Sequence, residues 1–444
     1  MEGRLKPLSS IPRPAARSMP LTRSTHRLNG ELQQRVLPSD DMRYMRRALA
    51  LARRAEGRTS PNPLVGAVIV RGGRIIGEGF HRRAGAPHAE VVALQRAGAS
   101  AHGGTLYVTL EPCHHLGRTP PCTDAVLAAR IARVVVAARD PNPITDGRGI
   151  ARLRRAGIRV VTGLLEAEAE RLNEPFRKAM TSQMPLVLAK SGQSLDGKIA
   201  TAGGESRWIT SPAARRLVHH WRSRVDAVLV GVQTVLRDDP LLTVRGVARR
   251  PGRPIKVIVD SRLRTPPTAR CLSAASPAPS IVATTCLPRR GAGMAMRSRA
   301  QHRALTRSGA EVVAFPARRG RVPLRRLCRY LVRRGIQSVL IEGGGELLAG
   351  ALEERVVDRI LFFIAPVLLG GRSAPSSVGG AGVSRLTRAV RLAELTCRRV
   401  GPDLCIEARV VYPRGLAKGP GAGGGKAVRK RAPRPTPHSP PAVR

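Results

Sequence analysis

The sequence "EPCHHLGRTPPC" at residues 111–122 places two thiols, two imidazoles and three prolines in one short segment. The motif "PHAE" at residues 87–90 precedes it by about one predicted strand, so His88, Cys113 and Cys122 can converge at the ends of neighbouring elements. One imidazole nitrogen and two thiolates form a donor set that suits zinc. Because three protein ligands leave a fourth position open to water, the pattern predicts a catalytic zinc site.

Glu90 follows His88 by two residues, which at a helix start points both side chains toward one cavity. A carboxylate there can shuttle protons, and H-x-E followed by P-C-x-x-C is the signature of zinc deaminases. Here eight residues separate Cys113 from Cys122, where that signature has two. A core histidine with two small buried thiols is an alternative for each residue alone, but not for all three together with Glu90. A noncatalytic zinc-binding module is a further alternative, which leaves Glu90 and the open coordination position without a purpose.

The elements around these motifs alternate between strands and helices, which predicts an α/β domain. A helical spacing of apolar residues starts at residue 41, and Asp40 or Asp41 is expected to cap this helix. Strands are predicted at 64–70, 74–80, 105–110 and 133–138, and further helices at 88–98 and 123–131.

Three segments, "HAEVVAL", "TLYVTLEPC" and "HHLGRTPPCTDAV", resemble the deaminase half of the bifunctional riboflavin-biosynthesis deaminase/reductase family, whose thiols are separated by this kind of longer insert. "PNPLVGAVIV", "GEGFHRRAG" and "DPNP" are similar to the same family. The resemblance implies a cytidine-deaminase-like α/β/α zinc domain at 39–170. The family motif also has a histidine at the position of His115, which implies a substrate contact there, with an exposed loop histidine as the alternative. Asn62, between two prolines, could hydrogen-bond a pyrimidine edge, but turn chemistry alone also explains an asparagine at this position.

A second block, 180–412, has strand-like runs at 226–232, 255–260, 338–345 and 359–371, interleaved with helical patterns, and predicts a second α/β domain. No G-x-G-x-x-G follows its first strand, so a Rossmann domain is not indicated. The run "SVLIEGGGELLAGAL" leads from a strand through three glycines into a helix, where backbone N–H groups can bind phosphate.

The segments "AKSGQSLDGKIA", "GESRWITS", "VGVQTVLRDDPLLTVR" and "IEGGG" resemble the reductase half of the family, which implies a dihydrofolate-reductase-like fold that uses NADPH. By this resemblance the positions near the sugar-phosphate substrate are Lys190, Ser206, Arg222, Leu242, Arg245 and Glu342. Those near the nicotinamide cofactor are Gly192, Trp208, Thr234, Asp238, Ser261, Gly343, Gly344 and Gly345.

The chemistry of several of these residues agrees with such roles, and each has a plainer alternative. Arg222 and Arg245 offer planar forks for a phosphate dianion, or are solvated arginines. Lys190 is expected to be catalytic, as a proton donor or anchor, unless it is an exposed lysine. Glu342 could bind ribose hydroxyls or cap a turn, and Trp208 could instead pack in the core.

The composition has 77 Lys+Arg against 30 Asp+Glu and a formal net charge of +47, which raises the alternative of a nucleic-acid deaminase. The basic residues are spread along the whole chain and aromatic residues are only 2%, so we favour a solvated basic surface and do not expect a nucleic-acid partner. Seven cysteines without regular spacing argue against a disulfide framework and favour the cytoplasm. No apolar run reaches eighteen residues, so no membrane span is expected.

The sequence therefore predicts a bifunctional enzyme that binds Zn²⁺ and NADPH. The resemblance implies hydrolytic deamination of 2,5-diamino-6-(5-phosphoribosylamino)pyrimidin-4-one, followed by reduction of the ribosyl to the ribityl side chain, giving 5-amino-6-(5-phosphoribitylamino)uracil. A homo-oligomer is expected. Residues 1–38 and 413–444 are expected to be basic, disordered segments. For the first, a transit peptide and a start codon placed too far upstream are the alternatives.

Overall fold

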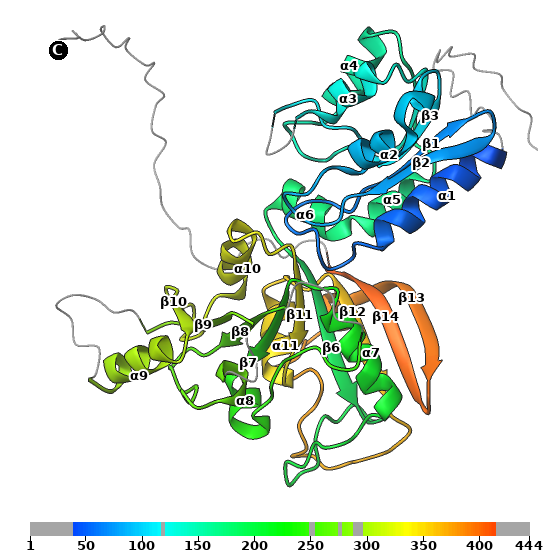
Figure 1. The fold of residues 1–444 in the computed structure, drawn as a ribbon. Helices are drawn as coiled ribbons and strands as arrows, with labels where there is room; N and C mark the ends of the chain where they lie inside the picture. Colours follow the sequence, from blue (N-terminus) through cyan, green and yellow to red (C-terminus); the bar gives the residue numbers. More distant parts are fainter. Residues whose placement is uncertain (1–38, 117–119, 248–253, 274–277, 287–295, 414–444) are drawn as a thin grey trace, which may run out of the picture. The chain divides into compact units, whose positions relative to one another are not determined.

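The computed structural model describes residues 39–116, 120–247, 254–273, 278–286 and 296–413. The predicted arm 1–38, and the predicted tail 413–444 apart from Pro413, lie outside the described residues. Two β-sheets organise the described ranges, and each has its own set of helices (Figure 1). No helix in these ranges is both long and apolar enough to cross a membrane.

The first sheet has the strand order β2-β1-β3-β4-β5. Its strands are β1 Gly66–Arg71, β2 Arg74–Phe80, β3 Thr105–Leu110, β4 Arg133–Ala138 and β5 Arg159–Thr162. The helices of this part are α1 Ser39–Arg53, α2 Ala89–Ala97, the 3-10 helix η1 Gly98–Ala101, α3 Cys122–Ala128, α4 Arg148–Arg155 and α5 Glu166–Leu172. β1 pairs antiparallel with β2 and β3, whereas β3, β4 and β5 run parallel. The strands and helices predicted around the zinc motifs are confirmed.

Helices cover both faces of this sheet. Ala93 of α2, Val126 of α3 and Leu153 of α4 belong to one buried cluster with the side chains of β1, β3 and β4 that point to that face. On the opposite face α1 lies against β1 so closely that a Cβ on Gly66 would meet the Ala48 carbonyl oxygen at 2.0 Å. This arrangement is the predicted α/β/α layering.

Close approach of α2 to β2 depends on two glycines of that strand. A Cβ on Gly79 would lie 2.2 Å from the Ala89 carbonyl oxygen, and one on Gly77 would lie 2.3 Å from the Ala93 carbonyl oxygen. Real Cβ atoms cannot approach a carbonyl oxygen so closely, so only glycine allows the helix to lie here. The start of α2, which carries His88 and Glu90, is fixed by this packing.

The predicted capping of the first helix by Asp40 or Asp41 is wrong. α1 begins at Ser39, so both residues lie in its first turn. Asp41 is buried and accepts hydrogen bonds from the Tyr107 hydroxyl at 2.5 Å and from Arg133 Nη2 at 2.6 Å. The hydrogen bond from Arg133 holds the pKa of Asp41 below its usual value. This carboxylate therefore joins α1 to the sheet instead of capping the helix.

The second sheet has the order β10-β9-β8-β7-β11-β6-β12-β14-β13. Its strands are β6 Leu186–Gln193, β7 Ala227–Gly231, β8 Ile255–Val259, β9 Ser280–Thr284, β10 Ala310–Ala314, β11 Ser338–Glu342, β12 Arg359–Ile364, β13 Arg391–Val400 and β14 Asp403–Val411. Its helices are α6 Glu174–Ser182, α7 Pro212–Arg222, α8 Val232–Asp238, α9 Met296–Arg307, α10 Leu324–Arg333 and α11 Gly345–Glu353, with 3-10 turns η2 Arg270–Leu272 and η3 Leu386–Arg388.

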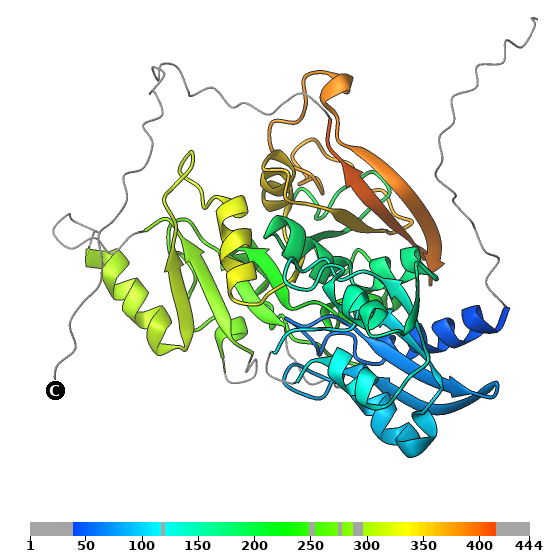
Figure 2. The same ribbon diagram turned by 90° about the horizontal axis from the view of Figure 1, so that it is seen from above.

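The strands from β10 to β12 are all parallel, and β14 and β13 extend the sheet as an antiparallel hairpin. Figures 1 and 2 both place β10 and α9 at one end of this sheet and the β13–β14 hairpin at the other. Parallel strands bring their carboxyl ends to one edge, where ligands of open α/β sheets bind. Residues following β6, β7, β8 and β11 therefore lie along the same edge.

The predicted strand at 359–371 is wrong beyond residue 364. β12 ends at Ile364, and the apolar run continues as a loop in which Leu368 is 73% exposed. Gly370 and Gly371 have φ angles of +63° and +81°, which a strand does not adopt. The Asp196 carboxylate accepts hydrogen bonds from the backbone N–H groups of Leu369 and Gly370, so the loop is bound to the segment that follows β6.

Candidate active sites

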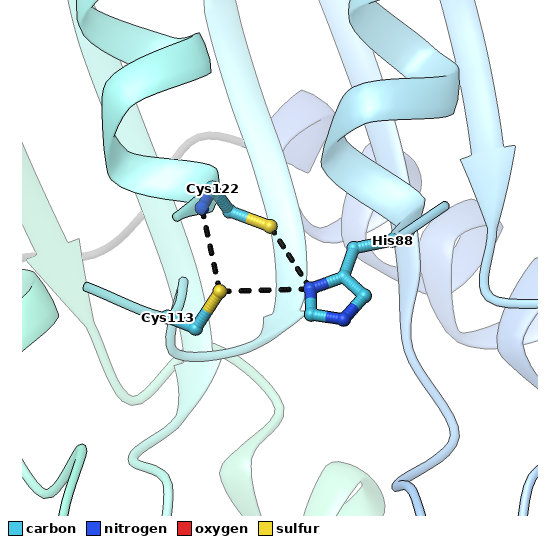
Figure 3. A group of neighbouring side chains, drawn as sticks. All are labelled: His88, Cys113 and Cys122. Carbon is cyan, nitrogen blue, oxygen red and sulfur yellow. Dashed lines mark hydrogen bonds between the residues drawn. The ribbon is translucent and has the colours of Figure 1, made fainter. Parts of the chain in front are cut away.

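The three predicted zinc ligands lie together in the first domain (Figure 3). His88 directly precedes α2, Cys113 follows β3, and Cys122 is the first residue of α3. Nδ1 of His88 is 3.1 Å from Sγ of Cys122 and 3.5 Å from Sγ of Cys113, and all three ligand atoms lie within 4.8 Å of one another. A tetrahedral zinc would separate such atoms by roughly 3.5–3.8 Å. The donor set and its spacing therefore fit zinc.

The environment of these ligands favours a thiolate at Cys113. The Cys122 thiol and the His88 ring hydrogen-bond to its sulfur, and together they lower the pKa of Cys113. The backbone N–H of Cys122 also donates to this sulfur at 3.3 Å. Thiolates rather than thiols bind metals, so the site is prepared electrostatically for a cation.

Glu90 lies in the first turn of α2 and is only 3% exposed. Burial, followed by the negative charge of Cys113, raises the pKa of Glu90 to about 7. A carboxyl group with a pKa near neutrality can both accept and return a proton under physiological conditions. Glu90 thus has the position and the acidity of a general acid/base.

Asn62 and the buried His81 form a hydrogen-bonded pair beside the ligands. Asn62 Nδ2 donates to His81 Nε2 at 3.0 Å, and His81 Nδ1 donates to the carbonyl oxygen of Pro87 at 3.2 Å. Burial lowers the pKa of His81, which keeps the ring neutral in this tautomer. The pair fixes the Asn62 amide so that its Oδ1 remains available to accept a hydrogen bond. Sequence reasoning missed His81, which lies inside the quoted "GEGFHRRAG" but has no metal-ligand spacing.

Glu111 was also missed as a site residue. Its buried carboxylate accepts hydrogen bonds from the backbone N–H groups of Gly147 at 2.9 Å, Ile150 at 3.1 Å and Asp140 at 3.3 Å. Glu111 therefore binds both the segment after β4 and the start of α4 to the chain two residues before the ligand Cys113. Gly149 completes this junction, because a Cβ there would meet the Pro112 carbonyl oxygen at 2.0 Å.

His115 is half-buried, and its ring lies 5.6 Å from that of His114. The buried Nδ1 atom of His115 has no hydrogen-bond partner among the residues that the structure describes, which exclude 117–119. A buried nitrogen in that condition is compatible with a ligand contact. The role of His115 in substrate binding stays a prediction.

A cavity of about 1470 Å³ lies along the carboxyl edge of the second sheet. Every residue predicted for the reductase site lines it: Lys190, Gly192, Ser206, Trp208, Arg222, Thr234, Asp238, Leu242, Arg245, Ser261, Glu342, Gly343, Gly344 and Gly345. The α11 helix begins at this cavity, with Gly344 as its N-cap and Gly345 as its first residue. Backbone N–H groups at a helix N-terminus bind phosphate groups, so the cavity fits a dinucleotide such as NADPH.

Arg222 and Glu342 form a bidentate ion pair at the cavity wall. Arg222 Nε lies 2.5 Å from Glu342 Oε1, Nη2 lies 2.8 Å from Oε2, and Nη1 donates to the Thr243 carbonyl oxygen at 3.0 Å. Burial raises the pKa of Glu342, but Arg222 outweighs this effect and leaves that pKa below its usual value. Arg222 therefore cannot bind a phosphate through Nε and Nη2, because the Glu342 carboxylate already accepts hydrogen bonds from both nitrogens.

Lys190 lies beside this pair, since β6 and β11 place it opposite Glu342 in register. Burial lowers the pKa of Lys190, Glu342 opposes the shift, and Arg222 adds to it. Lys190 is half-buried and lines the cavity, so the exposed-lysine alternative is wrong. An ammonium group with a lowered pKa gives up its proton more readily than an ordinary lysine.

Two further predicted residues occupy distinct positions around the cavity. Trp208 is 68% exposed and carries the guanidinium of Arg215 over its ring at 4.3 Å, so the core-packing alternative is wrong. The backbone N–H of Arg245 donates to Nδ1 of His219 at 3.2 Å. This hydrogen bond uses only the backbone of Arg245, and Arg245 lines the cavity.

Comparison with known proteins assigns families to both parts of the chain. Residues 38–138 match the cytidine and deoxycytidylate deaminase zinc-binding region, and residues 185–406 match the RibD C-terminal domain. The riboflavin biosynthesis protein RibD of Synechocystis is 44% identical over 365 residues, which cover 82% of this chain and 94% of the relative. That of Aquifex aeolicus is 42% identical over 366 residues, covering 82% and 97%. The chain belongs to the RibD family.

Two solved structures support the same assignment. RibD of Acinetobacter baumannii has a TM-score of 0.74 and 39% identity, and covers 84% of this chain and 99% of its own. A diaminohydroxyphosphoribosylaminopyrimidine deaminase/5-amino-6-(5-phosphoribosylamino)uracil reductase from Thermotoga maritima has a TM-score of 0.71 and 34% identity, with coverage of 84% and 99%.

Membership of the RibD family confirms the predicted fold class and the bifunctional character of the chain. It is an enzyme of riboflavin biosynthesis with a cytidine-deaminase-like, zinc-binding N-terminal domain and a dihydrofolate-reductase-like, NADPH-dependent C-terminal domain. The converged ligands His88, Cys113 and Cys122 lie within the range matched by the deaminase family. The residues predicted for the reductase site, all of which line the cavity of the second domain, lie within the range matched by the RibD C-terminal domain.

Proposed function

We propose that the first domain deaminates 2,5-diamino-6-(5-phosphoribosylamino)pyrimidin-4-one and that the second domain reduces the deaminated product. The observation that carries the proposal is the convergence of His88, Cys113 and Cys122 beside the buried Glu90. The relative from Thermotoga maritima is named for both reactions. Residues 39–170 and 180–412 are the two domains of this proposal.

In the deamination, water replaces the amino group at C2 of the pyrimidine. Zinc held by His88, Cys113 and Cys122 would make water nucleophilic near neutral pH. Glu90 accepts a proton from this water and delivers it to the departing nitrogen, so that a C–O bond forms, the C–N bond breaks and ammonia leaves. Asn62, held by His81, offers Oδ1 to an N–H group of the pyrimidine, and His115 contacts the substrate from the loop after Cys113.

In the reduction, the ribose opens to an imine between C1 and the attached nitrogen. NADPH held in the cavity of the second domain would supply the hydride for C1. Lys190 donates the proton that the nitrogen requires, which yields the ribityl side chain. Glu342 orients Lys190 and the sugar hydroxyls, while Ser206, Leu242 and Arg245 surround the sugar phosphate, and Arg222 acts by holding Glu342.

The test is an assay that follows ammonia release and NADPH oxidation separately in the purified, zinc-analysed protein. With the diaminopyrimidinone ribosylamino phosphate, wild-type protein should release ammonia first and then oxidise NADPH. Glu90→Gln should lose roughly 10²–10⁴-fold in ammonia release. The same variant should keep wild-type reduction of the deaminated substrate. Absence of both signals from folded, zinc-loaded wild type would overturn the proposal.

We also propose that the chain forms a homo-oligomer and acts in the cytoplasm. Leu392 is 43% exposed and Leu395 is 57% exposed on β13, the last strand of the second sheet. Exposed apolar side chains on an edge strand favour association with another surface. All seven cysteines are free, which suits a reducing compartment. Light scattering during size-exclusion chromatography tests the oligomer, and Leu395→Lys should shift it toward the monomer.

A further inference from the structure

The turn after β8 presents two arginines to the reductase cavity. Asp260 is fully buried and accepts hydrogen bonds from the backbone N–H and the hydroxyl of Thr265, both at 2.7 Å, and from the backbone N–H of Arg262 at 3.3 Å. Leu263 is buried in the core, whereas Arg262 and Arg264 on either side of it are exposed and line the cavity. The turn is thus rigid, and its two guanidinium groups point away from the core.

A second turn lines the same cavity. Residues 318–321 form a two-residue hairpin turn, in which the N–H of each end residue donates to the carbonyl of the other at 3.0 Å. Arg319 and Gly320 have φ angles of +52° and +70°, as a type I′ turn requires. The backbone N–H of Val322 donates to Oγ of Ser261 at 3.1 Å. This hydrogen bond joins the two turns through Ser261, which the family resemblance places near the nicotinamide cofactor.

The arginines of these turns are available for a ligand. Arg262, Arg264, Arg318 and Arg319 have no side-chain hydrogen bond or ion pair with the part of the protein that the structure describes. Elsewhere in the cavity Arg222 is engaged by Glu342, and Arg215 stacks on Trp208. Arg237, Arg245 and Arg270 also line the cavity without a side-chain hydrogen bond or ion pair to the described residues, but the four arginines of the two turns are the ones that the Val322–Ser261 hydrogen bond holds together beside β8.

The strand order places this charge at the adenosine end of a bound dinucleotide. Along the carboxyl edge the strands follow the order β8, β7, β11 and β6. Lys190 on β6 marks the reaction centre, and the glycines after β11 mark the pyrophosphate position at the start of α11. β8 lies two strands beyond β11, or about 10 Å at the usual strand spacing. The adenosine half of the cofactor can span that distance.

We propose that Arg262, Arg264, Arg318 and Arg319 bind the 2′-phosphate of NADPH and thereby select NADPH over NADH. The two cofactors differ only in that phosphate group. Guanidinium groups form charge-assisted, bidentate hydrogen bonds with phosphate, and an arginine near this position accommodates the 2′-phosphate in other dinucleotide-binding folds. The hydroxyl of Ser261 lies between the two turns and can donate to the same group. This inference rests on the proposed reductase function.

The test measures binding without turnover. Calorimetric titration with NADPH and with NADH compares wild type, the double variants R262Q/R264Q and R318Q/R319Q, and the control R326Q/R329Q. The control removes the same charge from exposed positions of α10 that do not line the cavity. Each turn variant should bind NADPH at least about tenfold more weakly and NADH within about twofold of wild type, as loss of one charged contact implies. The control should bind both as wild type does.

A fragment comparison separates the 2′-phosphate from the rest of the cofactor. Wild type should bind 2′,5′-ADP more tightly than 5′-AMP, and the turn variants should lose this difference while they unfold at the wild-type temperature. Equal weakening of NADPH and NADH, or wild-type NADPH affinity in both turn variants, would overturn the assignment. Wild-type protein that binds neither dinucleotide would contradict the reductase function itself, so the two failures are distinguishable.

Discussion

Glu342 and Arg222 are joined by two hydrogen bonds, and their side chains are only 10% and 13% exposed. Lys190 lies beside this pair and responds to both charges, since Glu342 raises its pKa and Arg222 lowers it. Burial is the largest cause of the lowered pKa of Lys190, and the two members of the ion pair modulate it in opposite directions. Each partner can be removed to test this effect.

Glu342→Gln should move the alkaline limb of the reductase pH profile to lower pH. The protonated form of Lys190 is the active form, so the rate falls as pH rises through its pKa. Loss of the neighbouring carboxylate lowers that pKa further, whereas Arg222→Gln removes a repelling cation and should move the limb to higher pH. The measurement is kcat against pH with the deaminated substrate. Shifts in the same direction for both variants would contradict this role of the pair.

Removing either partner should also destabilise the fold. A buried charge that loses its partner typically costs about 3–5 kcal/mol. Urea unfolding of the two single variants and of Arg222→Gln/Glu342→Gln gives the coupling energy. We expect the double variant to lose less free energy of unfolding than the two single variants lose together. Additive losses would show that the pair contributes nothing as a unit.

Glu90 should make the zinc-free protein less stable at alkaline pH. Its pKa in the folded protein is about 7, against an ordinary value of 4.5. Below the ordinary value the carboxyl is protonated in both states, so stability is unaffected. As pH rises from 4.5 to about 7, the unfolded chain releases this proton while the folded protein keeps it, so stability falls by about 3 kcal/mol and then stays at the lower level.

Glu90→Gln removes this titration. In the presence of a chelator, the variant should therefore be more stable than wild type at pH 8 and close to wild type at pH 4. Urea unfolding at the two pH values measures the difference. A variant that is equally or less stable at pH 8 would show that burial does not raise the pKa of this carboxyl group.

Chelation should separate the two activities. The residues that fit zinc belong to the deaminase range, and the cavity of the reductase range contains none of them. Removal of zinc should reduce ammonia release to background, while reduction of the deaminated substrate continues at the wild-type rate. Added zinc should restore ammonia release in wild type but not in Cys113→Ser. Parallel loss of both activities would imply that zinc supports the fold of the whole chain.

The sequence predicted the parts of the fold and the sites that depend on local pattern. His88, Cys113 and Cys122 were found because metal-ligand types at short spacing are rare by chance, and β1, β3 and β4 because continuous apolar runs are typical of buried strands. β13 was not predicted, since most of its side chains are exposed and its apolar residues do not alternate.

Partners distant in the sequence explain the remaining differences. Asp41 was interpreted as a helix cap because its partner Arg133 lies 92 positions away. Arg222 was interpreted as a free phosphate fork, and its partner Glu342 lies 120 positions away. Local pattern carries no information about such pairs. The same limit hid Glu111, whose hydrogen-bond donors are separated from it by 29 to 39 positions.

Glu111→Gln should loosen the zinc site without removing a ligand. The carboxylate accepts three backbone N–H bonds, and Gln offers only one acceptor oxygen, so donors at Gly147, Ile150 or Asp140 lose their partner. Residues 111–113 and the start of α4 would then separate, and Cys113 would lose its fixed position. Supporting residues of metal sites typically contribute about 10–100-fold to metal affinity.

Zinc transfer to a chromogenic chelator measures this effect independently of activity. Glu111→Gln should release zinc about 10–100-fold faster than wild type, in line with other residues that orient metal ligands. Its deaminase kcat should fall while KM stays near the wild-type value, because the substrate contacts are unchanged. The control is Glu166→Gln, an exposed glutamate at the start of α5. Wild-type zinc release in a Glu111→Gln protein of lowered thermal stability would show that Glu111 supports only the fold, and that Cys113 is positioned by other contacts.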